Sequence, residues 1–290
     1  MNPDLKSRLE KILSEPIKST SSVSGGCIAD SRKLQLESGK VFFLKQLSCS
    51  TNRAFDAEEC GLKELSKSGT VNVPEVVSKG PDFLLLEWIE KGFNRSSSSM
   101  EMLGRQFGEL HKYRGKKFGF CEDNLLGNSP QLNKPSEEAS LNWALFYAEN
   151  RLEFQTSIAI KKGYATREMR NLMDNLIKKV PELIYGTEEK PSLLHGDLWS
   201  GNYLMDEMGI PWLIDPAVYY GHREADLAMT SLFGGFSNTF YSAYKSVHPI
   251  DPGYAEREPL YHLYHLLNHL NLFGNGYYGQ VISILRRYAG

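Results

Sequence analysis

The residues best suited to chemistry form one run, His195-Gly196-Asp197-Leu198-Trp199-Ser200-Gly201-Asn202, followed by Asp215 after a turn-rich hairpin. Asp197 and Asn202 are five residues apart on what should be a tight loop, and Asp215 closes the next strand. Two carboxylates and an amide oxygen can thus converge on one point, as a magnesium nucleotide requires. The pattern predicts an ATP-dependent phosphotransferase in which Asp197 accepts the proton of the attacking hydroxyl, while Asn202 and Asp215 hold Mg²⁺ against the phosphates.

The loop is similar to that of protein kinases, H-R-D-x-x-x-x-N, except that Gly196 stands in place of the Arg. H-G-D is the form found in aminoglycoside, choline and related small-molecule kinases, so the change points away from protein substrates. The competing interpretation is a polar loop whose Asp and Asn only cap turns. The third carboxylate and the upstream residues described next favour the catalytic interpretation.

A lysine ends the apolar run Val41-Phe42-Phe43-Leu44-Lys45. Lys45 could be an ordinary surface residue, which buries its aliphatic chain and extends its ammonium group to water. In a nucleotide kinase, however, the third strand carries a lysine that pairs with the α- and β-phosphates and is oriented by a carboxylate of the following helix. Glu58 is the favoured partner because it lies one turn from Phe55 on the inward face of that helix. Glu59 is the competing choice.

Two further segments are candidates for nucleotide binding. Ser24-Gly25-Gly26-Cys27 is predicted to form a turn whose glycines let backbone N–H groups approach phosphate oxygens, although a Gly-Gly hairpin turn is common and the full G-x-G-x-x-G pattern is absent. The apolar strand from Phe83 ends in Glu87-Trp88-Ile89, where an exposed backbone edge could hydrogen-bond adenine. An ordinary core strand is the alternative, and the two interpretations are compatible.

Composition and charge narrow the class of protein. The chain has 290 residues, 41% of them hydrophobic, with 33 basic and 35 acidic side chains and a net charge of −2. We therefore expect no nucleic-acid partner and no anionic membrane surface as a partner. The charged N-terminus has no apolar signal core and no run could span a bilayer, so a cytoplasmic protein is expected. Four scattered cysteines without C-x-x-C spacing argue against a disulfide framework or a zinc site.

Hydrophobic periodicity predicts two lobes of different character. Residues 1–91 should form a nucleotide-binding lobe built on a small antiparallel sheet, and residues 92–290 a mainly helical lobe with the catalytic and metal loops. The boundary is placed at the polar, serine-rich stretch 92–99. Predicted strands are 23–28, 34–36, 41–45, 74–77 and 83–88. Predicted helices are 4–15, 54–68, 100–113, 141–160, 166–180, 223–234 and 254–272, with the catalytic loop and strand at 193–215.

With these residues in order, the chain resembles the fructosamine kinase (ketosamine-3-kinase) family of protein-kinase-like phosphotransferases. The resemblance covers nearly the whole chain and implies an α+β, two-lobed protein-kinase-like fold. The matching segments are Gly25-Gly26-Cys27-Ile28, Leu110-His111, Phe118-Gly119-Phe120, Asn124 with Gly127, Gln131 with Asn133, Trp143, Arg151-Leu152, the run 195–202, Ile214-Asp215-Pro216-Ala217 and the stretch 219–229.

The resemblance implies phosphorylation of the third hydroxyl of a ketosamine, the rearranged adduct of a sugar with a lysine or another amine. The 3-phosphate of such an adduct is unstable and leaves by elimination, so the activity amounts to deglycation. ATP and Mg²⁺ are the expected cofactors, and the acceptor could be free or attached to a protein lysine. Trp199 and His222 are candidates to line the sugar site, and Asp226 is expected to hold the catalytic loop through backbone hydrogen bonds.

Cys27 carries a separate hypothesis. A thiol in a phosphate-binding turn near Lys45 would favour the thiolate and hence oxidation, which could block ATP or cross-link two chains. A small side chain filling a strand turn is the plain alternative. A monomer or a redox-dependent homodimer is therefore expected.

Other classes of protein remain as alternatives. Another small-molecule kinase, of the aminoglycoside or choline type, would need an acidic wall for a cationic acceptor, and the chain shows no compact acidic cluster of that kind. A catalytically inactive ATP-binding regulator would bind ATP without turnover. A protein kinase is disfavoured because no A-P-E-bounded activation segment follows Asp215.

Overall fold

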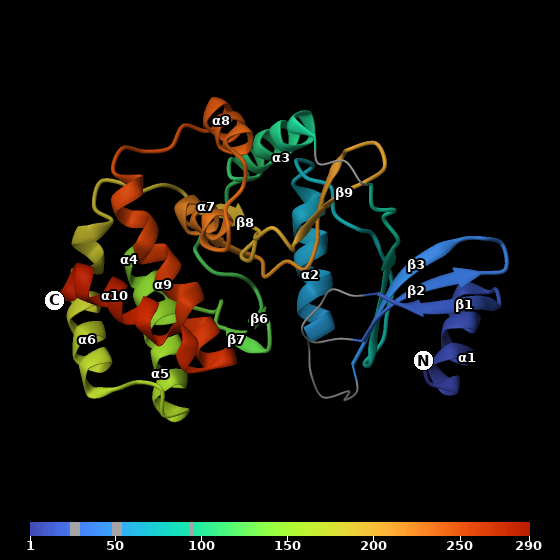
Figure 1. Ribbon diagram of the computed structural model, residues 1–290, viewed down its shortest axis with the longest axis horizontal. Coiled ribbons are helices and arrows are strands. Elements are labelled where there is room, and N and C mark those ends of the chain that lie inside the picture. Colours follow the sequence, from blue (N-terminus) through green and yellow to red (C-terminus); the bar gives the residue numbers. More distant parts are fainter. Residues whose placement is uncertain (24–29, 48–53, 93–95) are drawn as a thin grey trace.

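The chain forms two lobes, of which the first is built on a sheet and the second is mainly helical (Figure 1). This is a computed structural model that describes residues 1–23, 30–47, 54–92 and 96–290. The N-terminal lobe is a five-stranded antiparallel sheet in the order β1-β2-β3-β5-β4. The predicted α+β, two-lobed architecture is confirmed. The boundary between residues 91 and 92 stays a prediction.

Two helices enclose the sheet of the N-terminal lobe. The elements of this lobe are α1 (Pro3–Leu13), β1 (Ile17–Ser22), β2 (Asp30–Leu36), β3 (Val41–Gln46), α2 (Ala54–Lys67), β4 (Val76–Lys79) and β5 (Phe83–Glu87). Figure 1 shows α2 between the sheet and the helical lobe. The helix that was predicted to carry Glu58 therefore lies where its side chains can reach both lobes.

Alternation along the strands explains why Lys45 faces α2. Successive side chains of a strand point to opposite faces of the sheet. Phe83 and Leu85 pack with α1, whereas Leu84 and Leu86 pack with α2, so both faces of β5 are buried. Lys45 is paired in register with Leu84 and shares its face. The lysine is consequently directed to the side of the sheet that carries α2.

The helical lobe holds most of the remaining elements. These are α3 (Ser97–Leu110), β6 (Asn124–Leu126), β7 (Ser129–Gln131), α4 (Trp143–Phe146), a π-helical segment (Tyr147–Glu153), α5 (Phe154–Lys161), α6 (Arg167–Leu183), β8 (Ser192–Leu194), β9 (Tyr203–Met205), β10 (Pro211–Leu213), β11 (Tyr219–Gly221), α7 (Arg223–Leu232), α8 (Asn238–Val247), α9 (Tyr254–Phe273), a 3₁₀ turn (Asn275–Tyr277) and α10 (Tyr278–Ala289). Three antiparallel pairs, β6–β7, β8–β11 and β9–β10, interrupt the helices.

Two apolar clusters stabilise this lobe. One joins α5, α6, α9 and α10, and the other packs α3 and α8 against the β9–β10 hairpin. Leu65 of α2 and Leu198 of the catalytic loop both belong to the second cluster and are fully buried. Apolar burial thus anchors the catalytic loop and the helix that carries Glu58 to the same core.

Several predicted elements differ from the structure. The structure has a strand at 17–22 that was not predicted, and the predicted strand 23–28 lies, except for Val23, outside the described residues. The hydrophobic pattern did not predict this strand, because β1 lies at the edge of the sheet and only its Ile17 is buried. The predicted helix 141–160 is divided by the π-helical segment, and the sequence analysis missed α8, α10 and the β6–β7 hairpin.

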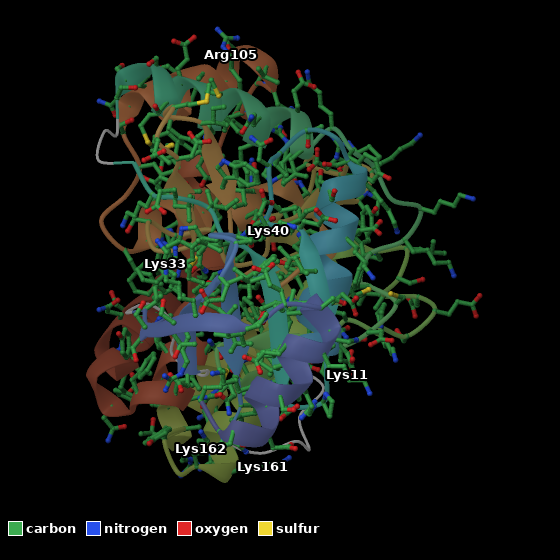
Figure 2. All side chains as sticks on the ribbon, turned by 90° about the vertical axis from the view of Figure 1, so that its right-hand side faces the viewer. Lys11, Lys33, Lys40, Arg105, Lys161 and Lys162 are labelled. Carbon is green, nitrogen blue, oxygen red and sulfur yellow. The ribbon has the colours of Figure 1, made fainter. Side chains whose placement is uncertain are left out.

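Basic side chains occur along the whole height of the view in Figure 2. In Figure 2 they extend from Arg105 of α3 at one end of the molecule, through Lys40 in the sheet lobe, to Lys161 of α5 at the other. Among the described residues, no helix combines the length and the apolar character that crossing a bilayer requires.

Candidate active site

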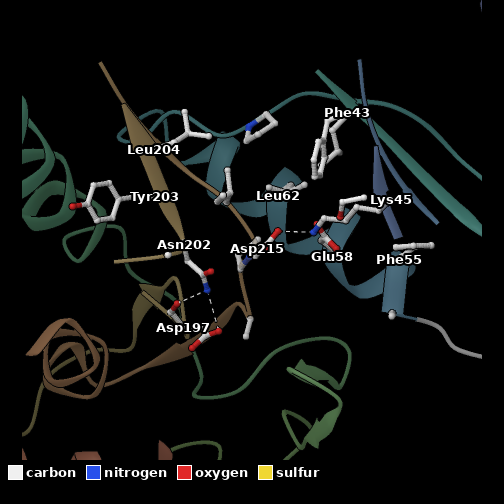
Figure 3. A pocket seen from close by; sticks show the side chains of 18 of the residues that line it. Phe43, Lys45, Phe55, Glu58, Leu62, Asp197, Asn202, Tyr203, Leu204 and Asp215 are labelled. Carbon is white, nitrogen blue, oxygen red and sulfur yellow. Dashed lines mark hydrogen bonds and ion pairs between the residues drawn. The ribbon is translucent and has the colours of Figure 1, made fainter. Parts of the chain in front are cut away.

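The predicted chemical residues surround a cavity of about 510 Å³ between the two lobes. Figure 3 shows Lys45 and Glu58 on one side of it, Asp197 and Asn202 on another, and Asp215 between them. The sheet, α2, the end of β5 and the loops of the helical lobe all contribute to its wall. Residues far apart in the sequence therefore meet at one place.

Lys45 is the positive centre of the cavity. Its Nζ lies 2.5 Å from Glu58 Oε1 and also donates to Asp215 Oδ1, and the residue is only 8% exposed. Burial alone would lower the pKa of Lys45, but the two carboxylates outweigh it and raise the pKa above its ordinary value. The lysine is thus held charged and oriented. Glu59 instead pairs with Lys63 and Lys79, so it is Glu58 that contacts Lys45, and the role of this pair in orienting a nucleotide stays a prediction.

Asn202 fixes the side chain of Asp197. Its Nδ2 donates to Asp197 O at 2.8 Å and to Asp197 Oδ2 at 3.0 Å. Burial raises the pKa of Asp197 well above its ordinary value, and the hydrogen bond from Asn202 offsets only part of that effect. An elevated pKa at a carboxylate that faces a cavity suits a group that accepts a proton during a reaction.

Asp226, in the first turn of α7, holds the backbone of the catalytic loop through hydrogen bonds. Its carboxylate accepts from His195 N at 2.7 Å and from Gly196 N at 2.9 Å, and His111 Nε2 lies 3.3 Å away. Burial would raise the pKa of Asp226, but the His111 ring and the backbone donors overcome it and lower the pKa. The structural role predicted for Asp226 is confirmed.

Gly196 has a conformation that explains why no arginine stands there. Its φ is +82°, in the left-handed region that favours glycine. A Cβ at this position would collide with the carbonyl oxygen of Ala217, which packs directly on the glycine. The Ala217 N–H in turn donates to His195 O at 2.9 Å. The catalytic loop and the segment after Asp215 are therefore in close backbone contact.

Asp215 and Asn202 supply oxygen donors that fit Mg²⁺. Asp215 has a φ of +53°, a conformation that Asp tolerates better than most residues, and its carboxylate lines the cavity beside Lys45. In the described residues, no hydrogen bond occupies Asn202 Oδ1 and no group of three or more His, Cys, Asp or Glu could hold a metal ion. Mg²⁺ typically takes one or two protein oxygens and completes its shell with phosphate and water, so these donors suit an ion that arrives with a nucleotide.

The residues predicted to bind the nucleotide base also reach the cavity. Glu87, Trp88 and Ile89 line it at the end of β5, beside apolar side chains of β3 and α2. Gly25, Gly26 and Cys27 lie outside the described residues, so their predicted contact with phosphates stays a prediction.

The two candidates for the sugar site have different positions. Trp199 lines the cavity and is 38% exposed, with its six-membered ring packed on Gly201. His222, by contrast, is 1% exposed and caps the N-terminus of α7 by accepting from Glu224 N at 3.2 Å. Its Nε2 bonds Thr187 O at 2.8 Å. The prediction that His222 lines the sugar site is corrected, because its ring is buried within the helical lobe.

Sequence reasoning missed one wall of the cavity. Asn124, Leu125 and Gly127, on or beside the β6–β7 hairpin, line it from the helical lobe. Asn124 and Gly127 were noted only as family matches. A three-residue strand gives too short a periodic signal to be predicted, so the family matches were the one available indication of this wall.

The fold and the site together define a class. A sheet lobe with a Lys–Glu pair, a helical lobe with an Asp–Asn loop and a following Asp are the parts of a kinase-like phosphotransferase. A solved structure of an ADP-bound aminoglycoside phosphotransferase shares this fold, with a TM-score of 0.67 at 16% identity over 100% of this chain and 98% of that one.

Within that class, the chain belongs to the fructosamine kinase family, whose model matches residues 1–289. A probable ketoamine kinase of Synechocystis is 40% identical over 93% of this chain and 90% of its own length. The ketosamine-3-kinase of Mus musculus is 36% identical over 93% of this chain and 94% of its own. A crystal structure of a putative fructosamine-3-kinase from Thermobifida fusca superposes with a TM-score of 0.89 at 29% identity, covering 99% of this chain and 98% of that one.

Proposed function

We propose that this protein is a ketosamine 3-kinase, which transfers the γ-phosphoryl group of ATP to the 3-hydroxyl of a sugar adduct on an amine and so leads to deglycation. The observation that carries the proposal is the convergence of Lys45, Asp197, Asn202 and Asp215 on one cavity, in a chain of the fructosamine kinase family. The relatives named as ketosamine or ribulosamine 3-kinases support this acceptor class over aminoglycosides or choline.

The residues of the cavity divide the chemistry among them. Lys45, oriented by Glu58, binds the α- and β-phosphates of ATP. Asn202 Oδ1 and the Asp215 carboxylate would hold Mg²⁺, which when bound offsets the negative charge on the transferring phosphoryl group. Asp197 orients the sugar hydroxyl and accepts its proton as the oxygen attacks. Its raised pKa makes it a stronger base than an exposed carboxylate.

The cavity wall supports a division between nucleotide and acceptor. The backbone edge of Glu87, Trp88 and Ile89 would receive adenine, and the glycine turn predicted at 25–27 would approach the phosphates. Trp199 would stack on the apolar face of the sugar, since its ring is partly exposed in the cavity. We expect acceptors that are free or attached to protein lysines, a cytoplasmic location, no nucleic-acid or membrane partner, and a monomer or a homodimer that depends on the redox state of Cys27.

The test is ADP release with Mg-ATP and a panel of acceptors: ribulosyl-lysine, fructosyl-lysine, kanamycin and choline. Asp197→Asn should lose turnover by about 10² to 10⁴-fold, as expected for removal of a general base, while ATP still binds. The matched control is Asp174→Asn on the exposed side of α6, which should retain activity. Turnover only with kanamycin or choline would refute the acceptor class, and ATP binding without any turnover would indicate an inactive regulator.

A further inference from the structure

A buried polar network reaches the active site from the helical lobe, and one of its members, Asn124, also lines the cavity. It consists of Tyr264 on α9, Gln131 at the end of β7 and Asn124 at the start of β6. Gln131 is 0% exposed, Tyr264 3% and Asn124 8%. Gln131 and Asn124 were noted in the sequence as family matches, and the mechanism above leaves them without a role.

Every member of the network has a defined hydrogen-bond direction. The Tyr264 hydroxyl donates to Gln131 Oε1 at 2.7 Å. Gln131 Nε2 then donates to Asn124 Oδ1 at 2.8 Å and to Ala217 O at 3.0 Å, and Asn124 Nδ2 donates to Val218 O at 2.9 Å. Because the Ala217 carbonyl can only accept, the NH₂ group of Gln131 must face it, and Oε1 is left to accept from the Tyr264 hydroxyl. The tyrosine therefore supplies the donor that this orientation of the glutamine needs.

The network ends on the peptide that links the two functional loops. Ala217 lies two residues after Asp215, and its N–H donates at 2.9 Å to His195 O, two residues before Asp197. The Ala217 carbonyl packs on Gly196 and accepts from Gln131. The carbonyls of Ala217 and Val218 are deeply buried, where an unpaired carbonyl would be costly. Hydrogen bonds thus fix the Ala217 peptide on both sides.

We propose that Tyr264, Gln131 and Asn124 are positioning residues that hold the Ala217 peptide and thereby set the separation of Asp197 and Asp215 on which metal binding and phosphoryl transfer depend. The inference rests on the proposed function for the identity of the metal nucleotide, and it concerns only this chain's own side chains. Removing groups that orient metal ligands without contacting the metal commonly lowers metal affinity or activity by about 10 to 100-fold.

The experiment compares two tyrosine-to-phenylalanine variants. Tyr264→Phe removes the donor to Gln131, and Tyr147→Phe is the matched control, because its hydroxyl is also buried in the helical lobe and donates at 2.7 Å to Leu260 O, away from the cavity. Mn²⁺, a paramagnetic substitute for Mg²⁺, is titrated by electron paramagnetic resonance in the presence of ADP, and the melting temperature of each variant is recorded. This readout needs no acceptor and no turnover.

Tyr264→Phe should weaken Mn²⁺ binding by about tenfold, whereas Tyr147→Phe should lose a similar amount of thermal stability and bind Mn²⁺ within about twofold of the wild type. Gln131→Glu is a second variant of nearly identical shape. It places a carboxylate oxygen against the Ala217 carbonyl and should weaken Mn²⁺ binding further. Equal Mn²⁺ affinity in Tyr264→Phe, Gln131→Glu and Tyr147→Phe would overturn the inference.

Failure of the proposed function gives a different result. If the wild type binds Mn²⁺ with ADP but phosphorylates no ketosamine, the acceptor assignment is wrong, and the comparison of the two tyrosine variants still decides the role of the network. If the wild type binds no Mn²⁺ with ADP, the proposed function and the positioning role are both refuted.

Discussion

Replacing Gly196 by alanine tests the backbone contact at the centre of the site. The change adds one methyl group at a φ of +82°, where it would collide with the Ala217 carbonyl oxygen. An L-residue in the left-handed region costs about 1 to 2 kcal/mol. Relief of the collision requires the Ala217 peptide to move, which would weaken its hydrogen bonds with His195 and Gln131 at about 1 kcal/mol each. We expect a total loss of about 3 to 4 kcal/mol in the free energy of unfolding.

Gly186→Ala is the matched control for that substitution. Gly186 has a φ of +79°, and a Cβ there would meet nothing within 4 Å. It should therefore show only the conformational cost, about 1 to 2 kcal/mol. Urea unfolding measures both variants, and the difference between them isolates the collision. Gly196→Ala should also lower kcat, since the Ala217 peptide joins the loops of Asp197 and Asp215. Equal stability and equal kcat in the two variants would refute the reasoning.

Three further predictions concern the charged and thiol groups. Lys45→Met should destabilise the fold by about 3 kcal/mol, because it leaves the mostly buried Glu58 carboxylate unpaired, and it should raise the KM for ATP. Adding Glu58→Gln should restore part of the stability but not the KM, as unfolding and steady-state assays will show. Because burial raises the pKa of Asp197, its ionised form weakens the fold at neutral pH, so Asp197→Asn should melt at a higher temperature than the wild type at pH 7. For the same reason the wild-type kcat/KM for the acceptor should fall with decreasing pH, through a midpoint above the pKa of about 3.9 of a free Asp. A pH profile that stays flat to pH 4 would contradict this. The thiols of Cys60 on α2 and Cys121 in the helical lobe lie 4.0 Å apart, so glutathione disulfide should oxidise the pair to a disulfide between the lobes. Mass spectrometry should detect the linked peptides, with a loss of two hydrogens, and the link should be absent in Cys121→Ser.

Local patterns were sufficient for several parts of the site. The spacing from Asp197 to Asn202 and the position of Asp215 after a strand indicated a convergence that the cavity shows. The inward face of the helix, marked by Phe55, favoured Glu58 as the partner of Lys45, and the two side chains are in contact. These inferences held because period and spacing determine side-chain direction within one element.

Other residues could not be placed in this way. His222 follows the metal segment closely in the sequence, yet it caps α7 and is buried near Trp143 and Tyr261. A histidine near a functional motif has the same sequence signature whether it faces a cavity or a core. The β6–β7 hairpin was missed because its two strands have three residues each. Its contribution to the cavity depends on contacts with segments almost a hundred residues away.

The sequence by itself determined the chemical inventory, the lobe characters and the pairing of Lys45 with Glu58, because these depend on residue type and on periodicity within single elements. Only the tertiary structure decided that His222 is structural, that the β6–β7 hairpin forms part of the cavity wall, and that Tyr264 and Gln131 lie in hydrogen-bond contact with the Ala217 peptide. These features arise from packing and hydrogen bonds between distant segments, whose direction no local pattern encodes.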